Sequence, residues 1–295
     1  MKKITDRVYI YPGETTVGLI TKDKVGLLID SHRESTVKKI LNFAKKKGIE
    51  IVGVLTTHSH ADHFGGHRYL HERGVKIFAP FQEEAMIKYP ILGPMGTSHG
   101  IYPFSFLQNQ YLMVDKPTPV DEVLELGEHE KFGLKFCLED LSGHTLGQVG
   151  ISYGDVFFIA DSLFCPRRMA KHKIPFHKCI KKELKTLDYL EKTDYKIYVP
   201  SHGDPLSRDE MLEKVDLNRK IILELENEIL EFLESPREIF EVYDHIFIQR
   251  NLNPPNGSLY FLLQNTILSY MSHLERDGYV KAEARNGRLY WVRVV

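Results

Sequence analysis

The alternation of apolar and polar residues at the start of the chain predicts short β-strands. Between Val8 and Asp30, segments rich in β-branched and aromatic residues are broken by glycine, a pattern typical of an antiparallel meander. Residues 34–47 then place apolar side chains at helical spacing, and Gly48 follows as a helix stop. The chain therefore begins with sheet and changes to helix at about residue 34.

Strands and helices alternate over the following residues. An apolar strand over 51–56 leads into a helix over 68–73, and another strand covers 75–80. The second half repeats this order in kind, with strands expected at 122–126, 132–139, 149–160 and 196–202 and a helix at 178–192. The order indicates an α/β layer arrangement in which helices cover sheets.

Glycines, prolines and aromatic residues interrupt the pattern between residues 91 and 119. We expect a long loop here, and loops of this length in compact domains often carry function. Its aromatic side chains either cover a bound substrate or pack in the core, two readings that the sequence leaves equal.

The last third of the chain is mostly helical. A strongly helical stretch over 207–234 ends at Ser235-Pro236. Beyond it, the pattern predicts a helix over 236–246, then a longer one over 259–278 that is continuous or broken near Asn265. A hairpin around Asn286-Gly287 follows. Helices followed by a hairpin resemble a winged helix.

Charge gives no support for binding to a polyanion. The chain has 39 Lys and Arg residues against 40 Asp and Glu residues, so no positive excess attracts nucleic acid over long distances. The basic residues of 236–295 are also nearly balanced by acidic ones. Dimerisation or substrate lining is therefore favoured over duplex recognition for that part.

The cysteines and the lack of long apolar segments indicate the cellular compartment of the protein. Cys137, Cys165 and Cys179 show no CxxC spacing and cannot all pair within one chain. This indicates a reducing compartment and buried free thiols. Neither a leader-like start nor a long uncharged apolar segment is visible, so we expect a cytoplasmic protein with no membrane partner.

Four residues with metal-binding side chains, His58, His60, Asp62 and His63, lie within six positions. His58 and His60 are two apart at the end of a predicted strand, so their side chains leave the same face with Cα atoms roughly 6.5 Å apart. Asp62 and His63 follow where the chain turns into a helix. Imidazole and carboxylate ligands together suit zinc and similar metals, and a solvated polar loop rarely combines them by chance.

Three further candidates, His144, Asp161 and His202, each follow or end a predicted strand. Ligands at the strand ends of one sheet edge converge on a single cleft. We therefore expect all these side chains to meet in one metal site.

This combination of motifs resembles the metallo-β-lactamase superfamily, whose His-x-His-x-Asp-His signature is matched by residues 58–63. Its later positions are matched by Gly143-His144-Thr145, Ala160-Asp161-Ser162 and Ser201-His202-Gly203. The resemblance implies an α+β fold, the four-layer αβ/βα sandwich with metals at one edge of the paired sheets. We expect 1–205 to be the metal-binding catalytic domain, 206–235 a connecting helix and 236–295 a winged-helix-like domain.

The resemblance also implies two divalent metal ions, with zinc favoured over iron or manganese. It gives His58, His60 and His144 to the first ion, Asp62, His63 and His202 to the second, and Asp161 to both. A metal-bound hydroxide would attack a carbonyl or phosphoryl centre, with Asp62 and Asp161 as the catalytic residues.

The ligand set argues against two other branches of the superfamily. His60 stands where the diiron oxygen-reducing branch has Glu, and Asp161 stands where the antibiotic-hydrolysing lactamases have Cys. We expect a thioester or ester as substrate, as for hydroxyacylglutathione hydrolase. The alternative is a phosphodiesterase or single-strand ribonuclease. A metal-sensing DNA-binding regulator is a third reading, against which the complete ligand set argues. The expected partner is a small-molecule substrate, and a homodimer stays open.

Several nearby residues have weaker signals. Asp30 matches the family position that anchors the site by hydrogen bonding, although an Asp that caps a loop is a close alternative. His67 and His71 lie four apart on the predicted helix, for which a solvated face is favoured. The basic segment 167–178 has two interpretations, contact with an anionic substrate or a solvated loop, and the solvated loop is slightly favoured. Weak candidates for lining the pocket are His32, His99, His172 and His177.

Overall fold

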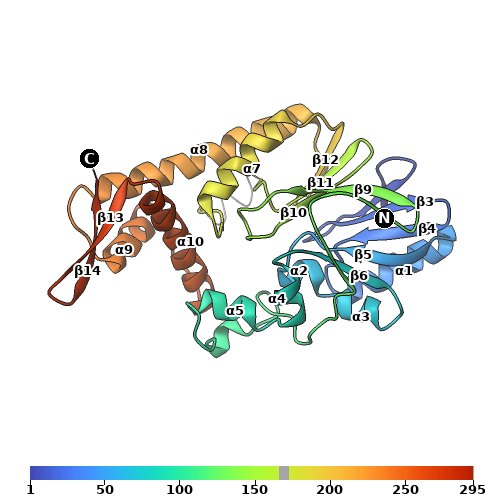
Figure 1. Cartoon of the computed structure of the whole chain (residues 1–295), viewed down its shortest axis with the longest axis horizontal. Coiled ribbons are helices and arrows are strands. Elements are labelled where there is room, and N and C mark those ends of the chain that lie inside the picture. Colours follow the sequence, from blue (N-terminus) through green and yellow to red (C-terminus); the bar gives the residue numbers. More distant parts are fainter. Residues whose placement is uncertain (166–172, 295) are drawn as a thin grey trace.

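The computed structural model describes residues 1–165 and 173–294, and two sheets form its main body (Figure 1). Within residues 1–165, seven strands form the first sheet in the order β1-β2-β3-β4-β5-β6-β7. Neighbours from β1 to β4 are antiparallel, and neighbours from β4 to β7 are parallel. The strands are β1 (Lys2–Lys3), β2 (Val8–Tyr11), β3 (Val17–Lys22), β4 (Val25–Ile29), β5 (Glu50–Leu55), β6 (Lys76–Pro80) and β7 (Glu122–Leu124).

The second sheet faces the first one. Of the described strands, five belong to it in the order β12-β11-β10-β9-β8. β11 and β12 are parallel, whereas the other neighbours are antiparallel. The strands are β8 (Gly127–Lys131), β9 (Leu134–Asp140), β10 (Val149–Tyr153), β11 (Val156–Ala160) and β12 (Ile197–Pro200).

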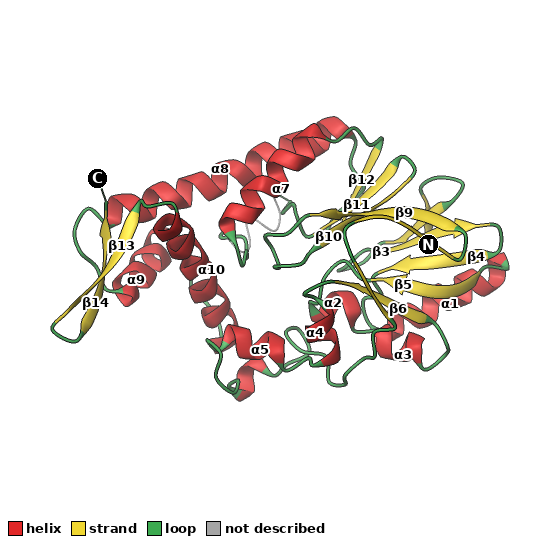
Figure 2. Cartoon of the chain, in the orientation of Figure 1, coloured by secondary structure: helices red, strands yellow, loops and turns green. Residues whose placement is uncertain are grey.

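Helices cover the outer faces of both sheets (Figure 2). α1 and α3 lie on the first sheet, and α7 and the start of α8 lie beside the second sheet. The helices are α1 (Glu34–Lys47), α2 (Ala61–Phe64), α3 (His67–His71), α4 (Glu84–Lys88), α5 (Leu92–Thr97), the 3-10 helix η1 (Ser105–Leu107), α7 (Ile180–Lys192), α8 (Arg208–Phe232), α9 (Ile239–Gln249) and α10 (Gly257–Arg276). Gly48 ends α1 with φ of 67°, the left-handed conformation that the predicted helix stop requires.

Both faces of each sheet bury apolar side chains. Ile20 and Phe158 pack between the sheets, in one core. Their neighbours in the same strands point the opposite way, because side chains alternate along a strand: Leu19 packs with α1, and Phe157 packs in a core shared with α7 and α8. The fold is therefore the four-layer αβ/βα sandwich of the α+β class that the sequence predicts.

The C-terminal third consists of α8, α9, α10 and the hairpin β13 (Val280–Arg285) with β14 (Arg288–Arg293). The hairpin around Asn286-Gly287 is confirmed, and both residues have positive φ, at 51° and 75°. α10 is one continuous helix, in which the side chain of Asn265 donates to the carbonyl oxygen of Phe261 at 2.8 Å. A winged-helix identity and the boundaries at 205 and 235 stay predictions.

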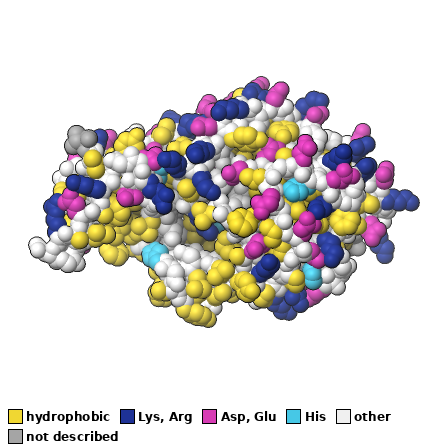
Figure 3. Space-filling model, viewed as in Figure 1, with side chains coloured by type: hydrophobic (Ala, Val, Ile, Leu, Met, Phe, Trp, Pro, Cys, Tyr) yellow, Lys and Arg dark blue, Asp and Glu magenta, His cyan; other side chains and the backbone are white. Residues whose placement is uncertain are grey.

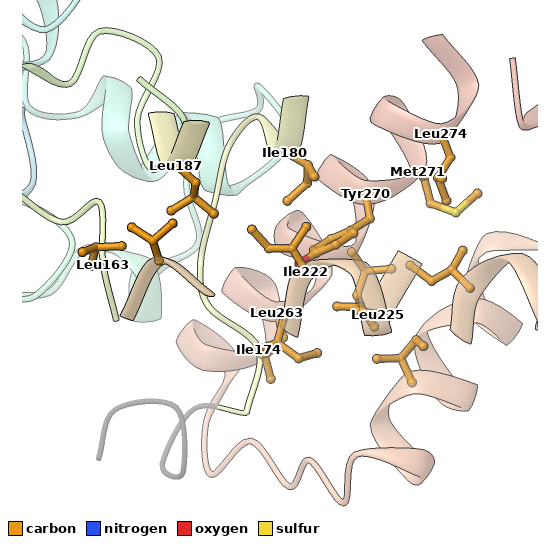
Figure 4. Close-up of a cluster of buried hydrophobic side chains, with 14 of the residues drawn as sticks. Leu163, Ile174, Ile180, Leu187, Ile222, Leu225, Leu263, Tyr270, Met271 and Leu274 are labelled. Carbon is orange, nitrogen blue, oxygen red and sulfur yellow. The ribbon is translucent and has the colours of Figure 1, made fainter. Parts of the chain in front are cut away.

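One hydrophobic core joins this C-terminal part to the second sheet. It contains Phe157 of β11, Leu187 of α7, Leu225 of α8 and Tyr270 of α10, all fully buried. Figure 4 shows how α7, α8 and α10 meet at this cluster. The long helix α8 is therefore packed at both ends.

The long loop predicted over 91–119 is mostly irregular, but it contains two short helices, α5 and η1. Phe104 and Phe106 of this segment pack on Phe261 of α10. These residues lie far apart in the sequence, so no local pattern predicts the contact. Residues 149–160 are a hairpin of β10 and β11 rather than one β segment, with the turn at Gly154.

Other expectations concern the cysteines and membrane-spanning segments. Cys137, Cys165 and Cys179 are free, as predicted, but each is partly exposed rather than buried. Among the described residues, no helix is long and apolar enough to cross a membrane.

Candidate metal centre

The candidate ligands come from the same edge of the two sheets. His58 and His60 follow β5 in an irregular loop, rather than at its extended end, and Asp62 and His63 lie on α2. The other three candidates follow strands of the second sheet: His144 after β9, Asp161 after β11 and His202 after β12. Their ring nitrogens and carboxylate oxygens form three groups, and within each group these atoms lie within 4.8 Å of one another. The structure therefore brings together every ligand that the sequence predicts.

His58, His60 and His144 form what we call the three-histidine cluster. Nδ1 of His60 lies 3.0 Å from Nε2 of His58 and 3.0 Å from Nε2 of His144. Three imidazole nitrogens directed at one point form a donor set typical of a catalytic zinc ion.

Asp62, His63 and His202 form the mixed cluster. Oδ2 of Asp62 lies 3.9 Å from Nε2 of His63 and 3.7 Å from Nε2 of His202. One carboxylate and two imidazoles suit the same class of borderline divalent metals.

The carboxylate of Asp161 lies between the two clusters. Oδ1 is 3.5 Å from Nε2 of His63, and Oδ2 is 3.1 Å from Nε2 of His202. Oδ2 is also 3.5 Å from Nε2 of His144 in the three-histidine cluster. This position matches that of a bridging ligand in a two-metal site.

Two buried polar atoms at the centre, Nε2 of His63 and Oδ1 of Asp161, form no hydrogen bond in the described structure, although they face each other at 3.5 Å. Buried polar atoms are normally paired, and an ion is one of the groups that satisfies such atoms. The donor set and these two atoms together fit a divalent metal.

Hydrogen bonds on the far side of three rings direct the other nitrogen toward the centre. Nδ1 of His144 donates to the carbonyl oxygen of Phe176 at 2.8 Å, and Nδ1 of His202 contacts the carbonyl oxygen of Glu14. Nδ1 of His63 lies 2.8 Å from Oδ2 of Asp30. Asp30 also accepts from the backbone N–H and the hydroxyl of Thr57, each at 2.8 Å. Asp30 therefore anchors the site by hydrogen bonding, which was one of the two roles expected for it.

The electrostatic environment keeps most of the candidates in their ligating form. Burial lowers the pKa of His58 and His60, and it lowers the pKa of His144 to about 4, so these rings are neutral at pH 7. Burial opposes ionisation of Asp62, yet the nearby positive charge of His63 contributes most to lowering its pKa to about 2. Burial likewise opposes protonation of His63, but three carboxylates raise its pKa to about 10. A cation is thus favoured where those carboxylates meet.

His67 corrects the expectation of a solvated helix face. Its side chain is completely buried, and its ring nitrogens lie 2.7 Å from the hydroxyl of Ser31 and 2.8 Å from that of Thr56. Burial, followed by the charge of His63, lowers the pKa of His67 to about 3. His71 is partly exposed, with a side chain 33% accessible.

The weaker candidates differ in their relation to the centre. Nδ1 of His32 lies 3.1 Å from the carbonyl oxygen of Asp62, and the ring of His177 lies 6.4 Å from that of His144. His99 instead packs on Phe261. His172 and residues 167–172 of the basic segment lie outside the described residues.

Two residues at the site have no signal in the sequence. The hydroxyl of Thr15 donates to Oδ2 of Asp62 at 2.7 Å, and Glu83 accepts from the loops that carry His60 and His144. Both lie far from their partners in the chain, so a local pattern cannot reveal them.

Comparison with known proteins identifies the family. Residues 10–202 match the sequence profile of the metallo-beta-lactamase superfamily. A hydroxyacylglutathione hydrolase from Shewanella loihica is 26% identical over 171 residues, which are 56% of this chain and 53% of that protein. The chain thus spans about half the length of this curated relative.

Two solved structures resemble the chain over nearly its whole length. A metallo-beta-lactamase family protein from Thermus thermophilus has a TM-score of 0.72 at 16% identity, covering 98% of this chain and 99% of that one. A beta-lactamase domain protein from Burkholderia ambifaria has a TM-score of 0.73 at 16% identity, covering 99% and 94%. Such low identity shows the fold alone. Since the profile covers more than half of the chain and the sandwich agrees with it, the chain belongs to the metallo-beta-lactamase superfamily.

Proposed function

We propose that this chain is a dinuclear metal-dependent hydrolase with a thioester or ester as substrate. The position of the Asp161 carboxylate, within 3.5 Å of ring nitrogens from both clusters, carries the proposal. Membership of the superfamily supports hydrolysis, and the similarity to a hydroxyacylglutathione hydrolase supports the thioester class.

In this proposal, the three-histidine cluster would hold one ion and the mixed cluster the second, and Asp161 could contribute to both. Zinc is favoured, with iron or manganese as alternatives, because imidazole and carboxylate ligands suit all three metals. Bound divalent ions supply Lewis acidity and lower the pKa of a water molecule toward about 7.

Asp62 is the residue of the chain best placed to handle a proton. Its side chain is 33% accessible, and the hydroxyl of Thr15 holds one of its oxygens at 2.7 Å. Its pKa of about 2 keeps it ionised at neutral pH. An ionised, partly accessible carboxylate can orient an attacking water molecule by accepting a hydrogen bond from it.

Lys178 supplies a positive charge near the three-histidine cluster. Burial lowers the pKa of His60 most, and the charges of His144 and Lys178 lower it further. Burial lowers the pKa of Lys178 itself, with the charge of Glu83 opposing this effect, and a charged Lys178 would stabilise negative charge that develops at a carbonyl or a phosphoryl centre alike.

The test is a substrate panel on protein reconstituted with zinc, manganese or iron. The panel contains glutathione thioesters and other thioesters, esters, lactones, phosphodiesters and single-stranded RNA. We expect about two ions per chain, with hydrolysis of a thioester or ester that a chelator abolishes. Turnover of phosphodiesters or RNA alone would contradict the substrate class, and one ion with full activity would contradict the dinuclear site.

Asp161→Ala is the matched variant for this test. We expect its rate to fall by roughly 10²-fold or more, because both ions lose a ligand. Asp155→Ala is the control, since Asp155 lies on the surface with a side chain 62% accessible and pairs with Lys196.

A further inference from the structure

The carboxylate of Glu83 lies buried next to the three-histidine cluster. Glu83 follows β6, and its accessibility is 0%. Oε2 accepts from the backbone N–H of Ser59 at 2.9 Å and also from the Ser59 hydroxyl. Oε1 accepts from the hydroxyl of Thr145 at 2.7 Å and from the backbone N–H of Gly147 at 2.9 Å. These donors offset the cost of burying the charge.

The partners of Glu83 adjoin the ligands in the chain. Ser59 separates His58 from His60, and Thr145 directly follows His144. Every member of the three-histidine cluster is thus next to a residue that Glu83 holds. The two oxygens of one side chain join loops that lie 84 residues apart at His60 and His144.

The packing around Gly147 supports a close approach of the same segments. A Cβ atom built on Gly147 would lie 2.6 Å from the carbonyl oxygen of Phe81 and 3.2 Å from Cγ of Glu83. Any larger residue would push the His144 loop away from Glu83. The loop geometry therefore depends on this contact independently of the hydrogen bonds.

Asp30 is a second buried carboxylate behind the candidate ligands. It contacts Nδ1 of His63 directly and accepts from both donors of Thr57. The Thr57 hydroxyl also lies 3.1 Å from Nδ1 of His58, so Asp30 supports a ring of each cluster, whereas the hydrogen bonds of Glu83 lie beside the three-histidine cluster.

We propose that Glu83 is a positioning residue for the three-histidine cluster, binding the loop of His58 and His60 and the loop of His144 into one unit. This inference rests on the metal centre of the proposed function but not on its substrate. Loss of Glu83 weakens metal retention by His58, His60 and His144 more than retention by Asp62, His63 and His202.

Glu83→Gln tests this role with almost no change in shape. A carboxylate accepts through both oxygens, whereas an amide offers NH₂ to one of the two donor pairs. Either the Ser59 donors or the Thr145 and Gly147 donors then face another donor, so one loop is released. Glu84→Gln is the control, because Glu84 carries the same charge one residue along and pairs with Lys88 at the surface of α4.

The experiment titrates metal-free full-length protein with zinc against a chromophoric chelator, for the wild type, Glu83→Gln, Asp30→Asn and Glu84→Gln. Crystals of each zinc-loaded protein then give the occupancy at each cluster from anomalous scattering. We expect Glu83→Gln to weaken one zinc about 10- to 100-fold, with reduced occupancy at the three-histidine cluster. Asp30→Asn should weaken both zinc ions, because Asp30 contacts His63 and also holds Thr57 against His58, and Glu84→Gln should match the wild type.

Equal weakening of both zinc ions in Glu83→Gln, or no weakening, would overturn the proposal, since a merely structural role does not select one cluster. If that variant does not fold, Thr145→Val and Ser59→Ala each remove one hydroxyl donor and carry the same test. Each should weaken the same zinc ion by a smaller factor. Wild-type protein that binds two zinc ions and hydrolyses nothing would refute the proposed function while leaving the role of Glu83 standing.

Discussion

At the scale of single residues, His67 shows how the surroundings of a side chain decide its chemistry. The Thr56 hydroxyl donates to the carbonyl oxygen of Phe78 at 2.9 Å, so it accepts from Nε2–H of His67. Nδ1 of His67 then accepts from the hydroxyl of Ser31. The neutral ring satisfies both of its neighbours, whereas a protonated ring would present a second donor to Ser31.

This arrangement predicts a specific pH dependence of stability. The pKa of His67 is about 3 in the folded protein and about 6.5 in the unfolded chain. Between these values the unfolded chain binds a proton that the folded protein does not, so the free energy of unfolding falls as pH decreases. Above about pH 6.5 the folded protein keeps the full benefit of the neutral ring.

His67→Gln removes this titration. We expect the variant to be about 1–3 kcal/mol less stable than the wild type at pH 8, because a buried hydrogen-bond pair is disturbed. That difference should shrink by about 2 kcal/mol at pH 5. Urea unfolding of the metal-free proteins between pH 5 and pH 8 measures it, with His71→Gln as the partly exposed control. A difference that is independent of pH would contradict the assignment.

At the scale of elements, α10 and the segment 97–109 hold each other in place. Phe261 lies 5.4 Å from Phe104 and 5.7 Å from Phe106 between ring centroids. Asn265 donates to the carbonyl oxygen of Thr97 at 2.9 Å, and Ser258 donates to that of Phe106 at 2.6 Å. Figure 3 shows hydrophobic side chains gathering over α10 and α5 on this face.

Phe261→Ala should loosen the segment without unfolding the protein. Aromatic pairs contribute about 0.5–1.5 kcal/mol each beyond the area they bury. We therefore expect amide exchange at Leu107, whose N–H donates to the carbonyl oxygen of Phe104, to accelerate roughly fivefold or more. Hydrogen–deuterium exchange measures this rate. Phe240→Ala on α9 is the control, since Phe240 is 64% exposed, and equal rates in both variants would contradict the coupling.

At the scale of the whole molecule, the core that includes α8 connects the second sheet to the C-terminal helices and to Val280 of the hairpin. Trp291, the single tryptophan of the chain, lies in β14 and packs against this core. Its backbone pairs with Arg237 at 3.0 and 2.7 Å. Its fluorescence therefore reports on the C-terminal third, whereas far-UV circular dichroism reports on all elements.

The continuous core predicts cooperative unfolding. We expect the urea midpoints of Trp291 fluorescence and circular dichroism to coincide. Leu225→Ala should lower both together, with a loss of about 2–5 kcal/mol for a fully buried leucine. Leu223→Ala is the control on the same helix, because Leu223 is 43% exposed. A separate, earlier transition of Trp291 would show instead that the C-terminal part unfolds independently.

The sequence by itself determined most elements and the identity of the candidate ligands. Strand alternation, the helix over 34–47 and the Asn286-Gly287 hairpin depend on neighbouring residues, so a local pattern contains them. His58, His60, Asp62 and His63 are likewise recognisable because they lie within six positions.

Only the tertiary structure decided which distant groups meet. The burial of His67, the hydrogen bonds of Glu83 to two loops and the packing of 97–109 on α10 all join residues far apart in the chain. Burial and hydrogen bonding in such contacts depend on how the sheets and helices pack, and no spacing in the sequence encodes them. For the same physical reason, a motif can identify ligands, while the residues that position those ligands become visible only in the folded chain.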